Sequence, residues 1–160
     1  MGFGEGSNFK RKETARDVHK VTEVTTATYT LSVEENGHIL ALNRPAGITV
    51  TLPADTLPVG WNIKMVVLST FTGTWKVATA DDGDPDLIFG SYMVVADTAA
   101  DEADVFAANG SSNDNIVLDS DAKGRFVGSW LEFFLMGEDE WVVRGETYGT
   151  GAPASGWSDT

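Results

Sequence analysis

The sequence predicts an all-β fold: a single compact β-sandwich or barrel, jelly-roll-like, with an extended N-terminal arm and a flexible C-terminal tail. About nine short segments rich in β-branched and aromatic residues recur at intervals of about 8–12 residues, separated by turn-forming Gly, Pro, Asn and Asp. No segment shows the 3.6-residue periodicity of an amphipathic helix. With 160 residues, 42% of them hydrophobic, the chain can bury the core of one domain.

The predicted strands follow one another from residue 18 to residue 145. Residues 18–33 are dense in Val, Thr and Tyr, and they predict one or two strands that end at an Asn-Gly turn. The other predicted strands span residues 38–43, 48–53, 61–70, 74–80, 87–95, 116–119, 126–136 and 140–145, with a bulge expected at Gly90. Residues 96–115 predict a long polar loop. No repeat of fixed period is present, which argues against a solenoid.

The connection after residues 48–53 is longer than a hairpin turn. The strand ends at Leu52-Pro53, because proline cannot donate to a central hydrogen-bond ladder. Pro58 and Gly60 then bend the chain back, and Trp61 begins the next apolar run. A tight hairpin needs only about two to five linking residues. We therefore expect the chain to cross a wider gap at one end of the sandwich or barrel, with Trp61 capping the core.

Both ends of the chain are predicted to be extensions. Residues 1–17 form the arm, residues 18–145 the β domain, and residues 146–160, which are rich in Gly, Ser and Thr, the tail. Trp157 has no apolar neighbours in the sequence. We therefore expect it either to anchor the tail on another subunit or to be disordered.

The charge is unevenly distributed. The chain has a formal net charge of −13, yet residues 1–20 carry five bases against three acids. The acidic remainder should repel nucleic acid and anionic lipid. No apolar run approaches the roughly 20 residues that span a bilayer, and the N-terminus lacks the apolar core of a signal peptide. The basic arm is either a solvated tail or a segment that docks on an acidic partner or a neighbouring subunit; its candidate docking residues are Phe3, Phe9, Lys10, Arg11, Lys12 and Arg16.

Few residues suggest chemistry. The chain has no cysteine, and it shows neither a nucleophile elbow nor a phosphate-binding loop. The acidic turn formed by Asp81, Asp82, Asp84 and Asp86 is a candidate calcium site. The segment 119–124 resembles the start of a calcium loop, but Lys123 occupies its fifth position and Trp130 its twelfth. Because Asp and Gly are also ordinary turn formers, no metal or other cofactor is predicted.

One set of motifs resembles a known family. In order, these are Leu52-Pro53-Ala54, Gly60-Trp61, the apolar strand 63–68, Trp75–Ala78, Asn115–Asp119, Gly128–Glu132 and the closing Glu140–Gly145. Over about residues 38–145 this order is similar to small virion structural proteins of tailed bacteriophages, several of which are taken to be capsid decoration (cement) proteins. The resemblance implies a non-enzymatic protein that is made in the host cytoplasm and binds the outside of the head. Its partners would be the major capsid protein and further copies of itself, commonly in a trimer.

Three other classes of function stay open. A tail, fibre-base or head-fibre/vertex component would share the resemblance. A carbohydrate- or host-binding module is expected to carry Trp or Tyr in projecting loops, whereas residues 96–115 contain only one aromatic residue, Phe106. A glycosidase would need two carboxylates facing each other across a cleft, and no pair among the 24 acidic residues stands out.

Overall fold

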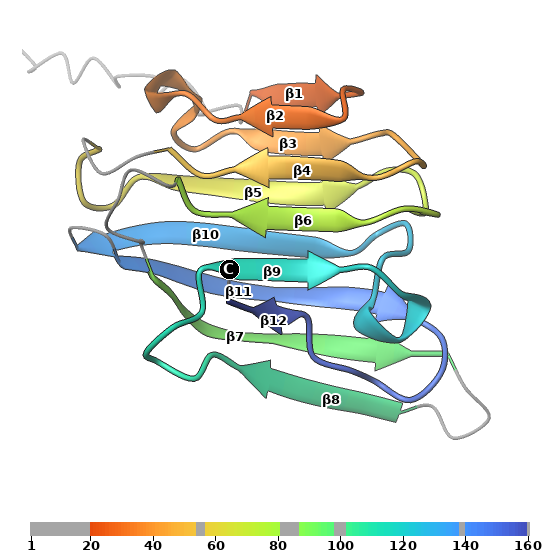
Figure 1. Cartoon of the computed structure of the whole chain (residues 1–160). Coiled ribbons are helices and arrows are strands. Elements are labelled where there is room, and N and C mark those ends of the chain that lie inside the picture. The colour runs from red at the N-terminus through yellow and green to blue at the C-terminus, as the bar shows by residue number, and fades with distance from the viewer. Residues whose placement is uncertain (1–19, 54–56, 81–86, 98–101, 138–139, 160) are drawn as a thin grey trace, which may run out of the picture.

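The computed structural model describes residues 20–53, 57–80, 87–97, 102–137 and 140–159 (Figure 1). Two β-sheets pack face to face, so the predicted all-β sandwich is confirmed. The helical structure in the described residues is limited to two short 3-10 segments, η1 (Val33–Glu35) and η2 (Asp121–Lys123).

Each sheet mixes parallel and antiparallel strands. Sheet A has the order β1-β3-β5-β10-β11-β7-β8, and sheet B has the order β12-β9-β6-β4-β2. The strands of sheet A are β1 (Val21–Val24), β3 (Ile39–Leu42), β5 (Asn62–Val67), β7 (Leu87–Ala96), β8 (Glu102–Ala107), β10 (Trp130–Gly137) and β11 (Glu140–Gly149). The strands of sheet B are β2 (Thr28–Thr30), β4 (Ile48–Thr51), β6 (Trp75–Ala78), β9 (Asn115–Leu118) and β12 (Trp157–Ser158).

The first six strands form a short parallel coil. Successive strands alternate between the sheets, with β1, β3 and β5 parallel in one and β2, β4 and β6 parallel in the other. The argument against a solenoid is therefore wrong for this half of the molecule. Val21 pairs with Ile39, and Ile39 pairs with Lys64, so successive coils span 18 and 25 residues. This unequal length is why the sequence shows no fixed period.

The long connection between β4 and β5 has the expected role. It carries the chain from sheet B to sheet A, across the end of the sandwich. Trp61 is buried at its close, and its ring meets that of Trp141 edge-on at a centroid distance of 5.7 Å. Trp75 is also fully buried and stacks on Phe71. Large rings of this kind contribute much of the apolar area that a core buries.

Three predictions about local structure are wrong. The expected loop 96–115 contains β8, which pairs with β7 along the margin of sheet A. Residues 146–159 are not a tail, because β11 continues to Gly149 and β12 pairs with β9. Gly90 is not a bulge, since β7 and β11 pair in continuous register through it. Its φ is +98°, and a Cβ atom there would lie 2.3 Å from the carbonyl oxygen of Val143, so glycine permits a close approach of the two strands.

Candidate functional site

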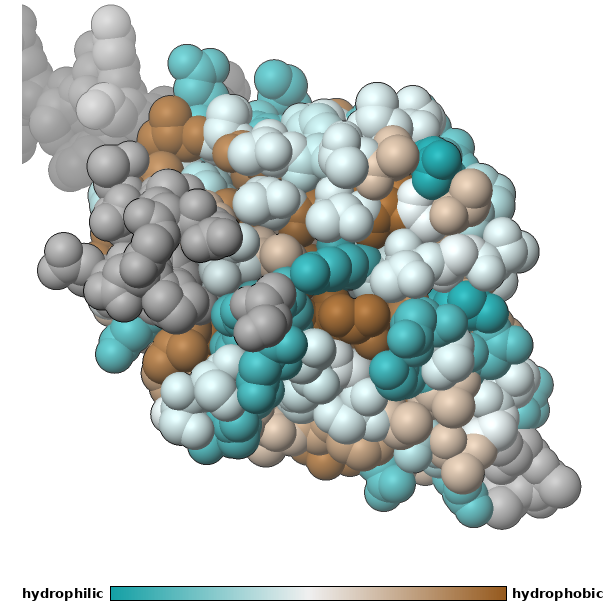
Figure 2. All heavy atoms as spheres, viewed as in Figure 1, coloured by the Kyte–Doolittle hydropathy of each residue, from teal (hydrophilic) through white to brown (hydrophobic). Residues whose placement is uncertain are grey.

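The outward face of sheet B is polar. The inward residues of its strands are buried, and the alternate positions face solvent. Its outward side chains include Thr28, Thr30, Thr49, Thr51 and Lys76. Figure 2, which looks onto this sheet, shows mainly pale and teal residues over β2, β4 and β6. Threonine supports a strand and accepts hydration, which is the pattern expected where one side of a sheet meets water.

The outward face of sheet A has a different composition. Its strands show the same alternation of buried and partly exposed residues, but the partly exposed positions are largely apolar. On the four central strands they include Val66, Phe89, Met93, Val95, Trp130, Phe134 and Val142. We call the outward surface of β5, β10, β11 and β7 the apolar face. Val21 and Val105, on the two outermost strands of the same sheet, are 60% and 66% exposed.

The charged groups at the centre of the apolar face bind other side chains of the face. The Lys64 ammonium lies 4.2 Å from the centroid of the Trp130 ring, and the Arg144 guanidinium lies 5.1 Å from that of Phe134. Arg144 also forms an ion pair with Glu132, with 2.8 Å between nitrogen and oxygen. Cations that rest on ring faces and pair with a local carboxylate need fewer new partners when a protein covers them.

These residues form two neighbouring rows across the strands. Lys64, Glu132 and Arg144 are paired across β5, β10 and β11 in one row. The next row contains Val66, Trp130 and Glu146. Adjacent rows of this kind lie about 7 Å apart along the strands, because the rise is about 3.3 Å per residue.

Two depressions border these rows. One, of about 410 Å³, lies at the carboxyl ends of β7 and β11, where Val95 and Tyr148 form part of a mainly apolar wall together with Phe126. The Tyr148 hydroxyl donates to the Glu146 carboxylate, and this raises the pKa of Tyr148. The other depression, of about 330 Å³, has a wall that includes all three members of the Lys64–Glu132–Arg144 row. The apolar face is therefore not flat.

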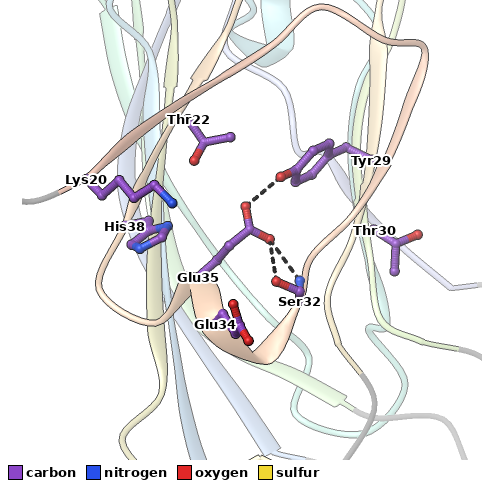
Figure 3. Close-up of a pocket in the computed structure, with 8 residues that line it drawn as sticks. All are labelled: Lys20, Thr22, Tyr29, Thr30, Ser32, Glu34, Glu35 and His38. Carbon is purple, nitrogen blue, oxygen red and sulfur yellow. Dashed lines mark hydrogen bonds between the residues drawn. The ribbon is translucent and has the colours of Figure 1, made fainter.

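A polar cavity of about 400 Å³ lies at the opposite margin, between β1 and β2 (Figure 3). The buried Glu35 carboxylate accepts hydrogen bonds from the Tyr29 hydroxyl at 2.5 Å and from the Ser32 backbone N–H at 2.8 Å. Desolvation, with the bond to Glu35 as a smaller cause, raises the pKa of Tyr29 to about 12. Lys20 and His38 line the other wall. Because the carboxylate is held by its own chain, we interpret this cluster as a polar cap on the end of the coil.

The residues predicted for the arm and for calcium cannot be placed. Phe3, Phe9, Lys10, Arg11, Lys12 and Arg16 lie outside the described residues, as do Asp81, Asp82, Asp84 and Asp86. Within the described ranges, no group of three or more His, Asp or Glu side chains could hold a metal ion.

The second acidic segment, residues 119–124, is held by its own cations. Asp119 pairs with Lys123 at 2.9 Å, and Asp121 pairs with Arg125 at 2.9 Å. Arg125 also donates to the backbone carbonyls of Thr72 and Gly73, which ties this loop to the one between β5 and β6. These carboxylates therefore stabilise the loop at the end of the sandwich.

Trp157 has partners within its own chain. Its ring packs on that of Tyr92 at a centroid distance of 5.8 Å, and its Nε1–H donates to the Phe106 carbonyl at 3.1 Å. The expectation of a disordered side chain is therefore wrong, and the ring expected to anchor the tail on another subunit packs on its own chain. Both partners lie more than 50 residues earlier in the sequence, where no local pattern links them to Trp157.

The apolar face was not anticipated from the sequence, although a signal for it exists. The segment 61–70 is apolar at both alternating sets of positions in its centre. This pattern predicts a central strand, which is the position of β5 in sheet A, and strands that are apolar on both sides are usually buried on both. Val66 and Trp130 are instead partly exposed, so one side of the central strands lacks a cover within the described residues.

Comparison with known proteins does not assign a function. No protein-family model matches the chain, and a search of curated proteins finds no match. In the part of the chain that is described, no helix has the length and apolar character needed to cross a membrane.

Proposed function

We propose that this protein is a capsid decoration (cement) protein of a tailed bacteriophage, which binds the outer surface of the head and stabilises the assembled shell. The observation that carries a structural role in an assembly is the contrast between the two outward faces of the sandwich. An outward sheet face that exposes several large apolar side chains is typical of a protein contact site. The motif order between residues 38 and 145, which resembles small virion proteins of tailed phages, suggests which assembly supplies the contact.

The proposed mechanism is mass action, without a cofactor or a catalytic step. A ligand that binds only the assembled shell stabilises the shell by a free energy of RT ln(1 + [L]/Kd), where [L] is the concentration of free ligand. The arm residues Phe3, Phe9 and Lys10–Lys12, with Arg16, are proposed to contact the major capsid protein. The net charge of −13 keeps free copies apart before assembly and disfavours contact with nucleic acid or anionic membrane.

The protein is also proposed to associate with itself on the shell. The resemblance implies a homo-oligomer, commonly a trimer, over junctions between capsid subunits. Several copies joined together hold several arms on one surface, and such multivalent attachment raises the effective affinity well beyond that of a single arm. This gives the two parts of the molecule separate roles, with the arm reaching the shell and the sandwich carrying the self-association.

The experiment that tests the function is reconstitution on purified heads that lack the protein. We expect hundreds of copies to bind each expanded head and to raise the temperature at which heads release DNA. A variant lacking residues 1–17 should lose retention, whereas Thr49→Asp, on the outward face of sheet B, should bind normally. Failure to bind heads, with a few dozen copies found on tails or vertices instead, would contradict shell decoration and favour the tail or head-fibre class.

A further inference from the structure

We infer that the apolar face is covered by a second copy of this chain in a two-fold pair, in place of the trimer that the resemblance implies. The axis lies in the plane of the face and crosses the strands between the Lys64–Glu132–Arg144 row and the Val66–Trp130–Glu146 row. The inference rests on the proposed function only in treating the face as a protein contact. It goes further by naming the occupant and the residues that meet.

The size of sheet A suits a stable dimer. The four strands of the apolar face, spaced about 4.8 Å apart, make it roughly 20 Å wide, and strands of six to ten residues make it roughly 20–30 Å long, an area of roughly 400–600 Å². The outer strands of the same sheet extend this surface, with Val21 and Val105 exposed on them. Stable protein pairs bury about 800 Å² on each partner, so the contact takes in these outer strands as well.

The charge of the face also suits a pair. Each copy carries a formal net charge of −13, so two copies repel across most of their surface. The two middle rows of the apolar face carry two bases, Lys64 and Arg144, and two acids, Glu132 and Glu146. These two balanced rows allow two acidic chains to approach without a net charge at the centre of the contact.

The pattern of residues is self-complementary about the proposed axis. A two-fold rotation between the rows places each row opposite the other row of the second copy, strand by strand. Arg144 then faces Glu146 of the second copy, and the reciprocal contact repeats it, as an isologous interface requires. Glu132 faces Trp130 of the second copy, whose ring already carries a lysine ammonium. The two-fold pair therefore contains the contact between the Arg144 guanidinium and the Glu146 carboxylate twice.

The shape of the face agrees with the same axis. Trp130 of the second copy lies over the depression of about 330 Å³ whose wall contains Lys64, Glu132 and Arg144. One row further out, Phe89 lies opposite Val95 of the second copy, at the border of the mainly apolar hollow of about 410 Å³. Large rings that fill pockets near the centre of a contact supply most of its binding energy.

This arrangement places both N-terminal segments on one side of the pair. Because the axis runs across the strands, β1 of one copy lies over β1 of the other. The described chain begins at Lys20, directly before β1, in each copy. Two arms therefore start from the same edge and can reach one surface together, which is the geometry that bivalent attachment needs.

The first test is a charge exchange followed by sedimentation equilibrium of the full chain without heads. We expect the wild type to be a dimer, and Arg144→Glu or Glu146→Arg to weaken the pair about tenfold or more. The double variant R144E/E146R restores the facing pairs and should recover most of the affinity. Lys76→Glu, on the outward face of sheet B, is the control and should leave the dimer unchanged. Circular dichroism checks that each variant is folded.

The second test uses cross-linking, because the chain has no cysteine of its own. Ser91 faces Met93 of the second copy about the proposed axis, at the spacing of about 10 Å that separates packed sheets. A short bis-maleimide should therefore join the single variants S91C and M93C, mixed in equal amounts, into a covalent dimer, because neither chain then holds two thiols. An equal mixture of T49C and T51C, on sheet B, should stay monomeric on a denaturing gel.

Three results would overturn the inference. The first is a monomer at about 100 µM, far above the micromolar dissociation constant expected for such an interface. The others are a trimer, or a dimer whose affinity changes with neither Arg144→Glu nor Glu146→Arg. None of these results touches head binding, which is measured separately by reconstitution. Loss of head binding with an intact R144E/E146R-rescued dimer would instead contradict the proposed function and leave the pair standing.

Discussion

The two outward faces of the sandwich differ although the inward faces do not. Both sheets bury every second residue, so both satisfy the requirement of a common apolar core. Outward, sheet B presents threonines such as Thr49 and Thr51, while sheet A presents rings such as Trp130 and Phe134. The fold needs neither set of outward residues in particular. The difference is the basis of the proposal that sheet A meets a protein and sheet B meets water.

The difference extends to how charge is handled. On sheet B, Lys76 lies opposite Thr49 on the neighbouring strand, and the threonine side chain is uncharged. On sheet A, Lys64 and Arg144 are drawn over rings, and Glu132 is paired with Arg144. Exposed ion pairs of this type contribute little to the stability of a monomer. In the proposed pair, their value lies in prearranging charge on the surface that the second copy covers.

The largest expected effect is on self-association. Trp130→Asp places an unpaired carboxylate at the centre of the apolar face and should weaken the pair by about 100-fold, roughly 3 kcal/mol. Thr49→Asp makes the matched change on sheet B and should have no effect. Sedimentation equilibrium of both variants measures the comparison. Equal effects at the two positions would show that the faces are equivalent.

A smaller effect is expected inside the sandwich, where the last strand joins the sheets. Trp157→Ala removes the ring contact with Tyr92 and the bond to the Phe106 carbonyl. Because the indole is partly exposed, the loss should be about 2 kcal/mol, below the 3–5 kcal/mol typical of a fully buried tryptophan. Urea denaturation measures it, with Trp157→Phe as the milder control. An unchanged midpoint would mean that the segment after β11 does not stabilise the fold.

The third effect depends on pH. Burial raises the pKa of Tyr92 to about 12, above the unfolded value of about 10. The neutral form is therefore favoured in the folded chain. Its contribution is complete below pH 10 and is lost as the pH rises towards 12, by up to about 2 kcal/mol. Thermal melts between pH 9 and pH 12 should show this loss in the wild type and less of it in Tyr92→Phe.

Tyr29 is the control for that measurement. Its pKa is also raised to about 12, but its ring stands at the open polar cap, where solvent screens the charge. Tyr29→Phe should therefore change the alkaline loss much less than Tyr92→Phe does. The opposite ranking would show that the cap, and not the buried side of sheet A, limits stability at high pH.

The smallest effect concerns the monomer itself. Arg144→Gln removes the ion pair with Glu132 and the contact with Phe134, yet at dilutions where the chain is monomeric it should cost less than about 1 kcal/mol. Denaturation at low and high protein concentration separates this from the loss of pairing. A large loss at low concentration would mean that the row supports the fold and not the contact.

Local patterns in the sequence predict most of the strands but not their partners. Alternation identifies β4, a continuous apolar centre identifies β5, and Leu52-Pro53 marks a strand end because proline lacks an N–H. The sequence does not reveal the parallel coil, because successive coils differ in their number of residues and leave no fixed period. The strand β12 is only two residues long, and its ladder partner β9 lies about 40 residues earlier.

The site shows the same limit for a different reason. The sequence identifies apolar positions such as Val66 and Trp130, but it does not say which apolar positions the chain itself covers. Only the packing of sheet A over sheet B shows that these two residues face outwards. The arm was proposed from its charge, and its residues lie outside the described ranges, so that prediction stays untested.

The most direct test compares the two faces by chemical accessibility. Ser91→Cys and Thr49→Cys each introduce a single thiol at a partly exposed outward position, one on each sheet. Maleimide labelling is then timed at nanomolar and at high micromolar protein concentration. We expect the thiol at position 91 to label slowly only in the concentrated sample and the thiol at position 49 to label at one rate in both. Equal, concentration-independent rates at both positions would contradict the proposal that sheet A is the covered face.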